Sequence, residues 1–425
     1  MGFYSILFER PEDSLEREAV DAPAFFADLH LDQIIAGITA GKEEYRLTPL
    51  FYASLHTIDA ITYRQEIMRD LEDPTLLAHI NSFARRMRVM REHLGLAEKL
   101  HYKYQKERWF VDAVDVYCEA VTGLVDDLTR MDVKARGLLA FRDYLTSYTH
   151  SSTFTSLHTE TRKLLADLSA IRYCLLLKDN GFKVQKYESE IDYSVEVQNT
   201  FEKFQQGAVN DYRVNFAARL DMNHVEAKAL EFVAQLYPDT FRNLDHYCAT
   251  HSDYLDTTIA AFDREVQFYT ACLEYIEPFK RAGLAFCYPA VTGQSKEVYG
   301  CDVFDLALAN RLVREKTAVV TNDFHLNDPE RIFVVSGPNQ GGKTTFARTF
   351  GQLHYLASIG CPAPGKEARL FLFDSLFTHF EKEEDIATLR GKLHDDLVRI
   401  RRILDQATSS SIIVMNEIFT STTLQ

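Results

Sequence analysis

A glycine-rich stretch toward the carboxyl end constrains the fold of this chain more than any other feature. Residues 337–344 read Gly-Pro-Asn-Gln-Gly-Gly-Lys-Thr, which fits the spacing G-x-x-x-x-G-K-[ST]. An apolar run at 332–335 precedes the stretch, and a segment suited to a helix follows it. A loop between a strand and a helix turns backbone N–H groups toward an anion at the helix N-terminus. The sequence therefore predicts a strand at 332–335 and a phosphate-binding loop after it.

The residue types in this loop point to a nucleoside triphosphate. Its glycines allow the backbone N–H groups to face the α- and β-phosphates. Lys343 would neutralise the β- and γ-oxygens, and Thr344 would ligate Mg²⁺. We therefore expect ATP and Mg²⁺ as cofactors. The loop residues expected to contact them are Gly337, Pro338, Asn339, Gln340, Gly341, Gly342, Lys343, Thr344 and Thr345.

A second apolar run, at 411–415, ends in Asn416 and Glu417. A phosphate-loop ATPase places there the acidic pair that holds Mg²⁺ and polarises the attacking water. We predict Glu417 and Lys343 as catalytic residues, with Glu417 orienting or deprotonating water. Thr344 and Asn416 are the predicted metal residues. Asn416 lacks the formal charge of an aspartate, which predicts weaker metal binding or slower hydrolysis.

Several motifs resemble those of one protein family. Because Pro-Asn follows its first glycine, the loop is similar to the G-P-N-x-G-G-K-[ST] loop of MutS mismatch-repair ATPases. Val319 and Asn322 lie in a segment that resembles the family's adenine pocket, although Val319 stands where the family often has an aromatic ring. The stretch 374–404 resembles the part that carries the family's signature serine, and Gly391 falls near that position with Lys392 beside it. Residues 418–423 replace the family's glycine-rich dimer loop.

The resemblance extends to the first half of the chain. Residues 57–77 resemble the helical core segment that follows the N-terminal domains of MutS proteins, and we expect those N-terminal domains to be absent. Residues 3–6, Phe-Tyr-Ser-Ile, lack the Phe-x-Glu wedge that reads mispaired bases. The family's later strands and γ-phosphate-sensing histidine are also missing before Gln425, so we expect a fragment of a longer product.

Hydrophobic periodicity predicts the architecture. An apolar seam at 241–276 indicates one long helix or two in series, either a lever or a bundle helix, and a run at 109–128 is its expected antiparallel partner. Two β-prone runs within 171–188 flank Asp-Asn-Gly and predict a hairpin. We predict a multidomain α plus α/β fold. A helical core with levers and a reduced clamp (170–190) fills 1–290, and an ABC-type phosphate-loop ATPase domain with a mixed sheet, incomplete at its C-terminus, fills 291–425.

Composition limits the possible partners. With 47 basic and 62 acidic residues the net charge is −15, so nucleic-acid contact requires a local patch. Residues 85–108 form a local basic stretch, which is either a solvated helix face or a phosphate-binding surface. Seven scattered cysteines, no secretory signal and no long apolar span predict a cytoplasmic protein without membrane contact.

Two functions are compatible with these features. The resemblance implies a DNA-dependent ATPase of MutS type, whose paired ATPase domains form a homodimer and gate a clamp on duplex, mismatched or branched DNA in repair. The alternative is a non-catalytic ATP-binding switch whose helical arms hold a protein partner. A transporter-type or chromosome-condensing ATPase fits less well, because the Pro-Asn of the loop and residues 57–77 resemble neither.

Overall fold

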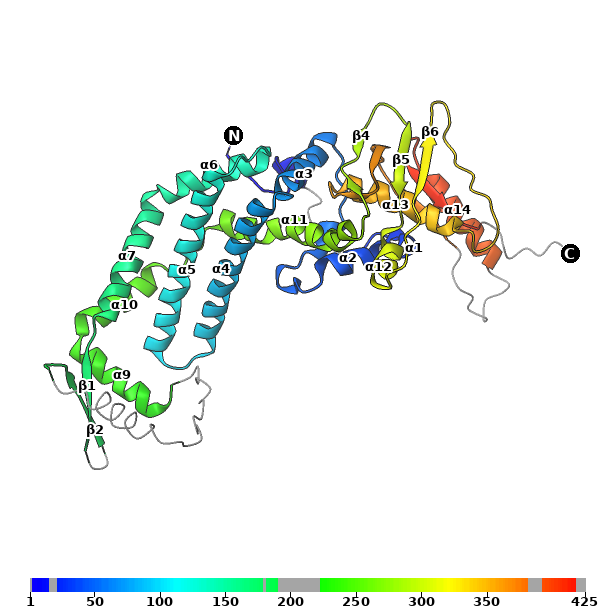
Figure 1. Cartoon of the computed structure of the whole chain (residues 1–425). Helices are drawn as coiled ribbons and strands as arrows, with labels where there is room; N and C mark the ends of the chain where they lie inside the picture. The colour runs from blue at the N-terminus through cyan, green and yellow to red at the C-terminus, as the bar shows by residue number, and fades with distance from the viewer. Residues whose placement is uncertain (1, 15–20, 179–180, 190–221, 381–391, 418–425) are drawn as a thin grey trace, which may run out of the picture. The chain divides into compact units, whose positions relative to one another are not determined.

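The computed structural model describes the chain except residues 1, 15–20, 179–180, 190–221, 381–391 and 418–425 (Figure 1). The chain divides into two compact units. Unit 1 contains Met1–Asn81, Val125–Leu145 and Thr257–Gln425, and unit 2 contains Ser82–Leu124 and Thr146–Asp256. The sequence-based boundary at residue 290 divides the chain by position rather than by packing, and it remains a prediction.

Helices dominate the first two thirds of the chain. The short 3-10 turns are Pro11–Ser14, Glu43–Tyr45 and Thr48–Phe51. The α-helices are α1 (Phe25–Leu29), α2 (Leu31–Thr39), α3 (Ile58–Leu71), α4 (Pro74–Lys99), α5 (Lys103–Arg130), α6 (Arg136–Thr149), α7 (Ser152–Ser169), α9 (His224–Leu236), α10 (Pro238–Thr250), α11 (Thr257–Arg281), α12 (Leu306–Arg314), α13 (Lys343–Ser358) and α14 (Lys392–Gln406).

The strands of unit 1 form small sheets near the carboxyl end. Their bounds are β3 (Phe286–Cys287), β4 (Ala290–Thr292), β5 (Val298–Val303), β6 (Asn322–Leu326), β7 (Ala363–Pro364), β8 (Glu367–Phe371), β9 (Leu376–His379) and β10 (Ile412–Met415). One sheet has the order β4-β8-β5-β6, in which β4 and β8 are parallel and the other pairs antiparallel. β9 and β10 pair in parallel, and β3 pairs with β7. The predicted α plus α/β class with mixed strands is confirmed at this level.

Helix α13 packs against the four-stranded sheet and forms the core of this region. Leu353 and Ala357 of α13 are buried with Phe324 of β6 and Leu370 of β8. Phe346 in the first turns of α13 lies 6.1 Å from Phe324 between ring centroids. The helix that follows the glycine-rich loop is therefore held by the sheet along its length.

The apolar run before the loop does not form the expected strand. Residues 332–335 are irregular, and Ile332 and Val334 expose 79% and 87% of their surface. Only Phe333 turns inward, where its ring lies 5.9 Å from that of Phe324. A strand requires a hydrogen-bonded neighbour, and none of the described strands pairs with this run. The prediction of a strand at 332–335 is therefore wrong for this structure.

The first residues of the chain are buried inside unit 1. Ser5, Ile6 and Leu7 expose 3% of their surface or less. Ser5 Oγ donates to buried Glu265 on α11 at 2.7 Å, and Tyr269 Oη donates to the Ile6 carbonyl at 2.6 Å. The segment that lacks a base-reading wedge thus serves here as part of the core.

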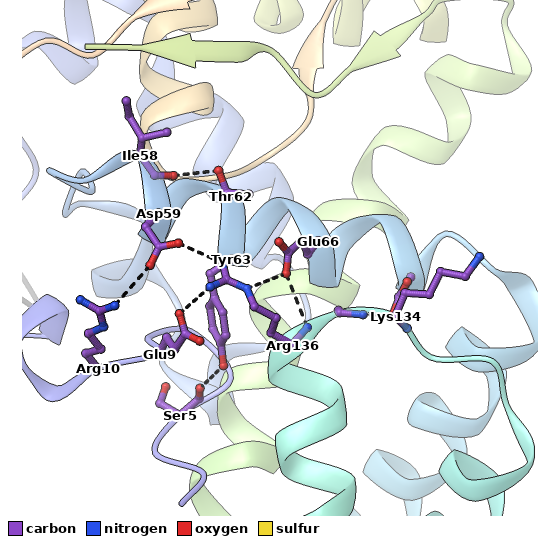
Figure 2. A network of polar contacts seen from close by, with 12 residues as sticks. Ser5, Glu9, Arg10, Ile58, Asp59, Thr62, Tyr63, Glu66, Lys134 and Arg136 are labelled. Carbon is purple, nitrogen blue, oxygen red and sulfur yellow. Dashed lines mark hydrogen bonds and ion pairs between the residues drawn. The ribbon is translucent and has the colours of Figure 1, made fainter. Parts of the chain in front are cut away.

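An ionic network attaches this segment to α3 and α6 (Figure 2). Arg136, which begins α6, pairs with Glu9 at 2.8 Å, Asp59 at 3.2 Å and Glu66 at 3.1 Å. Tyr63 Oη donates to the Ser5 carbonyl at 2.7 Å. Three carboxylates around one planar guanidinium orient it more strictly than a single surface pair.

In unit 2 the helices pack differently from the expected arrangement. α4 and α5 run antiparallel, because Arg86 contacts Glu119 and His93 contacts Trp109 (Figure 1). α10 runs parallel to α5. The ring contacts Tyr104–Phe241 and Phe110–Tyr247 show this, because the residue numbers rise together in both helices. The expected antiparallel pairing of residues 109–128 with the 241–276 seam is therefore wrong. The antiparallel neighbour of α5 is α4.

The seam itself consists of two helices in series. α10 ends at Thr250 and α11 begins at Thr257, so the alternative of one continuous helix is excluded. The predicted hairpin is confirmed: β1 (Tyr173–Lys178) and β2 (Gly181–Lys186) are antiparallel, with Lys178 opposite Gly181. Phe182 of β2 packs on Phe232 of α9.

All seven cysteines are free thiols, in agreement with the absence of a disulfide framework. Among the described residues no helix combines the length and apolar character needed to cross a bilayer.

A carboxylate pair lies at the contact between α5 and α10. Burial and the neighbouring Asp245 raise the pKa of Glu107 to about 7. Lys103 Nζ lies 2.6 Å from Asp245 and 3.9 Å from Glu107, so one ammonium faces two carboxyl groups.

Glu107→Gln is expected to stabilise the chain above about pH 7 by on the order of 1 kcal/mol. A carboxyl group whose pKa is higher in the folded state than in the unfolded state stabilises the fold. This stabilisation is complete at a pH below the unfolded-state pKa and is lost as the pH rises to the folded-state pKa. The glutamine variant should therefore show a flatter decline of stability between the ordinary glutamate pKa of 4.5 and about 7. Urea unfolding followed by Trp109 fluorescence measures this, with exposed Glu92→Gln as the control. An unchanged pH slope in Glu107→Gln would exclude the proposed titration.

Candidate nucleotide site

The glycine-rich loop leads directly into α13. Gly342 is the N-cap residue of this helix, with φ of +83°, and Gln340 also has a positive φ of +65°. A Cβ on Gly341 would lie 2.9 Å from the Pro338 carbonyl oxygen, so a side chain there would force the turn open. The Gly341 N–H donates to this same oxygen at 3.1 Å. The second and third glycines are thus required by the backbone path.

Lys343 folds back over the loop. Its Nζ donates to the carbonyl oxygens of Gly337 at 2.9 Å and Pro338 at 3.4 Å. Residues 337–342 are exposed, whereas Lys343 and Thr344 are half-buried. The ammonium therefore lies at the mouth of the loop beside the N-terminus of α13, where the helix dipole also favours an anion.

Thr344 meets the end of β10. Its Oγ1 donates to Asn416 Oδ1 at 3.1 Å, although the two residues are 72 positions apart. Two oxygens bound at right angles to one Mg²⁺, each about 2.1 Å from the ion, lie about 3 Å apart. The pair therefore fits two adjacent ligand positions of an octahedral Mg²⁺ site, one taken by the hydroxyl and the other by the amide oxygen. We call this pair the metal edge. Among the described residues no cluster of three or more His, Cys, Asp or Glu side chains could hold a metal ion, so such side chains form no alternative metal site there.

The backbone of β9 supports Asn416. Met415 pairs with His379 in the parallel β9–β10 ladder, and the Asn416 N–H donates to the His379 carbonyl at 2.8 Å. His379 is buried, and burial together with the Arg399 charge lowers its pKa. The imidazole is therefore neutral near pH 7, which avoids a further buried charge beside the site.

Glu417 follows Asn416 and is exposed, with φ of +54°. The left-handed backbone turns the chain sharply after β10, so Glu417 and Thr344 lie at the same end of this strand. The structure thus brings Thr344, which follows the loop lysine, into contact with Asn416, and Glu417 is the next residue along the chain. Whether Glu417 reaches a water beside bound phosphate remains a prediction.

The other predicted residues lie farther along the sheet or outside the described residues. Asn322 is exposed and begins β6, opposite Val303, and Val319 precedes it half-buried. β6 packs on α13 through Phe324, whose ring contacts Phe346. Gly391 and residues 418–423 fall outside the described residues, and Thr345 lies in the first turn of α13.

The basic stretch of unit 2 is partly engaged within the chain. Arg108 forms an ion pair with Asp112, and Lys103 with Asp245. Arg86 donates to the Glu119 carbonyl at 3.1 Å. Arg85 and Arg88 are exposed on α4. The interpretation as a solvated helix face is the simpler one for these side chains.

Sequence reasoning missed three residues beneath the site. Asp28 of α1, Thr378 of β9 and Arg399 of α14 are joined by hydrogen bonds of 2.6–3.1 Å. Asp28 and Arg399 are 371 positions apart, and Asp28 lies in a short helix without a motif. No local signal in the sequence could have paired them.

The fold and the site define a multidomain α plus α/β protein with a glycine-rich loop at the start of a sheet-packed helix. The model of the family MutS domain V matches residues 333–425, which include this loop, Asn416 and Glu417. With the relatives below, this match shows that residues 333–425 are similar to domain V of the MutS family.

The relatives are bacterial proteins named DNA mismatch repair protein MutS. That of Rickettsia bellii is 28% identical over 220 residues, which are 50% of this chain and 23% of the relative. That of Thermosipho melanesiensis is 32% identical over 99 residues, 23% of this chain and 12% of the relative. That of Rickettsia rickettsii is 33% identical over 107 residues, which are 25% of this chain and 12% of the relative. Each match thus spans less than a quarter of the relative's length.

Proposed function

We propose that this chain binds ATP with Mg²⁺ at residues 337–345 and hydrolyses it as a DNA-associated cytoplasmic protein of MutS type. The contact between Thr344 Oγ1 and Asn416 Oδ1 at the N-terminus of α13 carries the proposal. This contact supports a hydroxyl and an amide oxygen as the metal's protein ligands, beside Lys343, the lysine of the loop. The metal would supply charge neutralisation at the phosphates.

The chain's own residues have separate roles in this proposal. Backbone N–H groups of the loop bind the α- and β-phosphates, and Lys343 exchanges its contacts with the Gly337 and Pro338 carbonyls for γ-phosphate oxygens. Glu417 accepts a hydrogen bond from the attacking water and orients it. Val319 and Asn322 contact the adenine.

The proposal includes a homodimer through the ATPase domains and an ATP-gated clamp on duplex, mismatched or branched DNA. Its DNA part is supported by the relatives' name, DNA mismatch repair protein MutS. Salt-sensitive binding of duplex DNA together with DNA-stimulated ATP hydrolysis tests it. Absence of both, with ATP binding retained, would exclude the clamp.

The second candidate is a non-catalytic ATP-binding switch whose helical arms hold a protein partner. Asn416 favours it, because an amide at this position supplies no negative charge to the metal. The net charge of −15 also favours it, since it disfavours DNA. Measured turnover separates the two candidates, because both predict nucleotide binding.

Glu417→Gln is expected to lower the ATP turnover number about tenfold or more while the KM for ATP stays unchanged. Glutamine keeps the shape and a hydrogen-bond acceptor but loses the negative charge that polarises water. Steady-state phosphate release on the full chain measures the effect, with Glu330→Gln as a control because Glu330 is also exposed and carboxylic. Full turnover in Glu417→Gln would exclude Glu417 from water activation.

A further inference from the structure

Helix α1 lies against the helix that follows the loop. A Cβ on Gly351 of α13 would lie 2.6 Å from Leu29 Cδ1, so the two helices touch at this glycine. Gln352 of α13, fully buried, donates to the Leu29 carbonyl at 2.9 Å, and Arg348 Nε donates to the Asp28 carbonyl at 3.1 Å. The C-terminal end of α1 is therefore fixed to α13 by packing and by two hydrogen bonds.

The Asp28 side chain makes the opposite connection, to β9 and α14. Its Oδ2 accepts a hydrogen bond from Thr378 Oγ1 at 2.6 Å and from Arg399 at 3.0 Å. Arg399 also donates to the Thr378 carbonyl at 3.1 Å, which closes the triangle. The Asp28 side chain is only 15% exposed and Thr378 is 6% exposed, so these bonds are largely shielded from water.

This triangle is linked to the proposed metal edge by consecutive contacts. Thr378 precedes His379, whose carbonyl accepts the Asn416 N–H at 2.8 Å. Asn416 Oδ1 in turn accepts from Thr344 Oγ1 at 3.1 Å. Asp28 thus contacts the supports of both partners of the metal edge. Its backbone carbonyl contacts α13, which carries Thr344, and its carboxylate contacts β9, whose last residue accepts the Asn416 N–H.

We propose that Asp28 is a positioning residue of the metal edge, which with Thr378 and Arg399 sets the distance between Thr344 and Asn416. This inference rests on the proposed function and adds a residue that touches neither nucleotide nor metal. Asp28 meets α13 at Arg348, more than one helical turn beyond Lys343, so we expect the loop to retain phosphate binding without the triangle. The expected consequence is a selective loss of Mg²⁺ coupling.

Binding of a fluorescent ATP analogue to the full chain, with and without Mg²⁺, tests the inference. We expect Asp28→Asn and Thr378→Val to raise the half-saturating Mg²⁺ concentration about fivefold. Affinity for the analogue in EDTA should stay unchanged. Thr378→Ser keeps the hydroxyl and should match the unaltered chain. Asp32→Asn, which removes a nearby exposed carboxylate on α2, is the matched control.

Amide hydrogen exchange gives a second readout that needs no nucleotide. Peptides covering β9 and β10 should exchange faster in Thr378→Val than in Thr378→Ser. An unchanged Mg²⁺ midpoint in both Asp28→Asn and Thr378→Val, or an equal loss of affinity in EDTA, would overturn the inference. If Lys343→Ala loses binding while the Mg²⁺ midpoint of Asp28→Asn is unchanged, the inference fails and the proposed function stands. If the unaltered chain shows no Mg²⁺-dependent binding, both fail.

Discussion

Lys343→Ala is expected to lower the affinity for Mg²⁺-ATP at least about a hundredfold. The Nζ group is the ammonium of the only lysine within residues 337–345, and its two present contacts are neutral carbonyls. A γ-phosphate offers a stronger, charge-assisted bond. Losing one or two such bonds costs about 1.5–3 kcal/mol each, and about 1.4 kcal/mol corresponds to tenfold in affinity.

Isothermal titration of the full chain with Mg²⁺-ATP measures this loss. Alanine is a strong helix former, so the start of α13 should persist in the variant. Lys366→Ala is the matched control, since Lys366 is exposed in the same region and its removal changes the net charge equally. If Lys343→Ala bound as tightly as Lys366→Ala, the nucleotide would bind elsewhere and the assignment of residues 337–345 would be wrong.

Local chemistry predicted the parts of the fold that depend on neighbouring residues. Asn180 and Gly181 predicted the turn of the β1–β2 hairpin, and the register confirms two residues between Lys178 and Gly181. The glycines and the lysine of the loop predicted the approach of the chain to α13. In each case the determining atoms lie within a few positions of one another, so side-chain type and spacing carry the information.

The elements that the sequence did not predict depend on distant partners. Residues 332–335 have the composition of a strand, yet pairing requires a neighbour that composition does not specify. The seam at 241–276 keeps its period across the turn between α10 and α11, so periodicity could not separate two helices from one.

The same limit applies to the site. Thr344 and Asn416 were predicted together because each ends a recognisable motif. Asp28 and the buried Ser5 carry no motif, and their partners, Arg399 and Glu265, are more than 250 positions away. Long-range pairing of this kind follows from the assembled fold, which a local pattern does not contain.

Arg64 of α3 occupies the opposite end of α13 from the loop. It is 1% exposed, and its Nε donates to the Leu7 carbonyl at 3.1 Å and its NH1 to the Ile359 carbonyl at 3.0 Å. The guanidinium also lies 4.9 Å from the ring centroid of Phe8 and 5.0 Å from that of Phe268. Ile359 is the C-cap residue of α13, so a positive charge there complements the helix dipole.

Arg64→Met is expected to lower the free energy of unfolding by about 3 kcal/mol or more. Methionine fills much of the volume, but the Leu7 and Ile359 carbonyls lose their donors at about 1–3 kcal/mol each. Removing the buried charge offsets part of this cost, because burial already lowers the pKa of Arg64. The net loss should remain, since the carbonyls cannot reach water without displacing the N-terminal segment.

Urea unfolding of the full chain followed by far-ultraviolet circular dichroism measures this effect. Fluorescence would report mainly on unit 2, because Trp109 is the single tryptophan and lies there. Arg69→Met on the same helix is the control. Its side chain is exposed and lies 4.7 Å from the Tyr288 ring centroid, so its removal should cost no more than about 1 kcal/mol. Equal stabilities of the two variants would show that the N-terminal segment and the end of α13 are held by apolar packing rather than by the guanidinium.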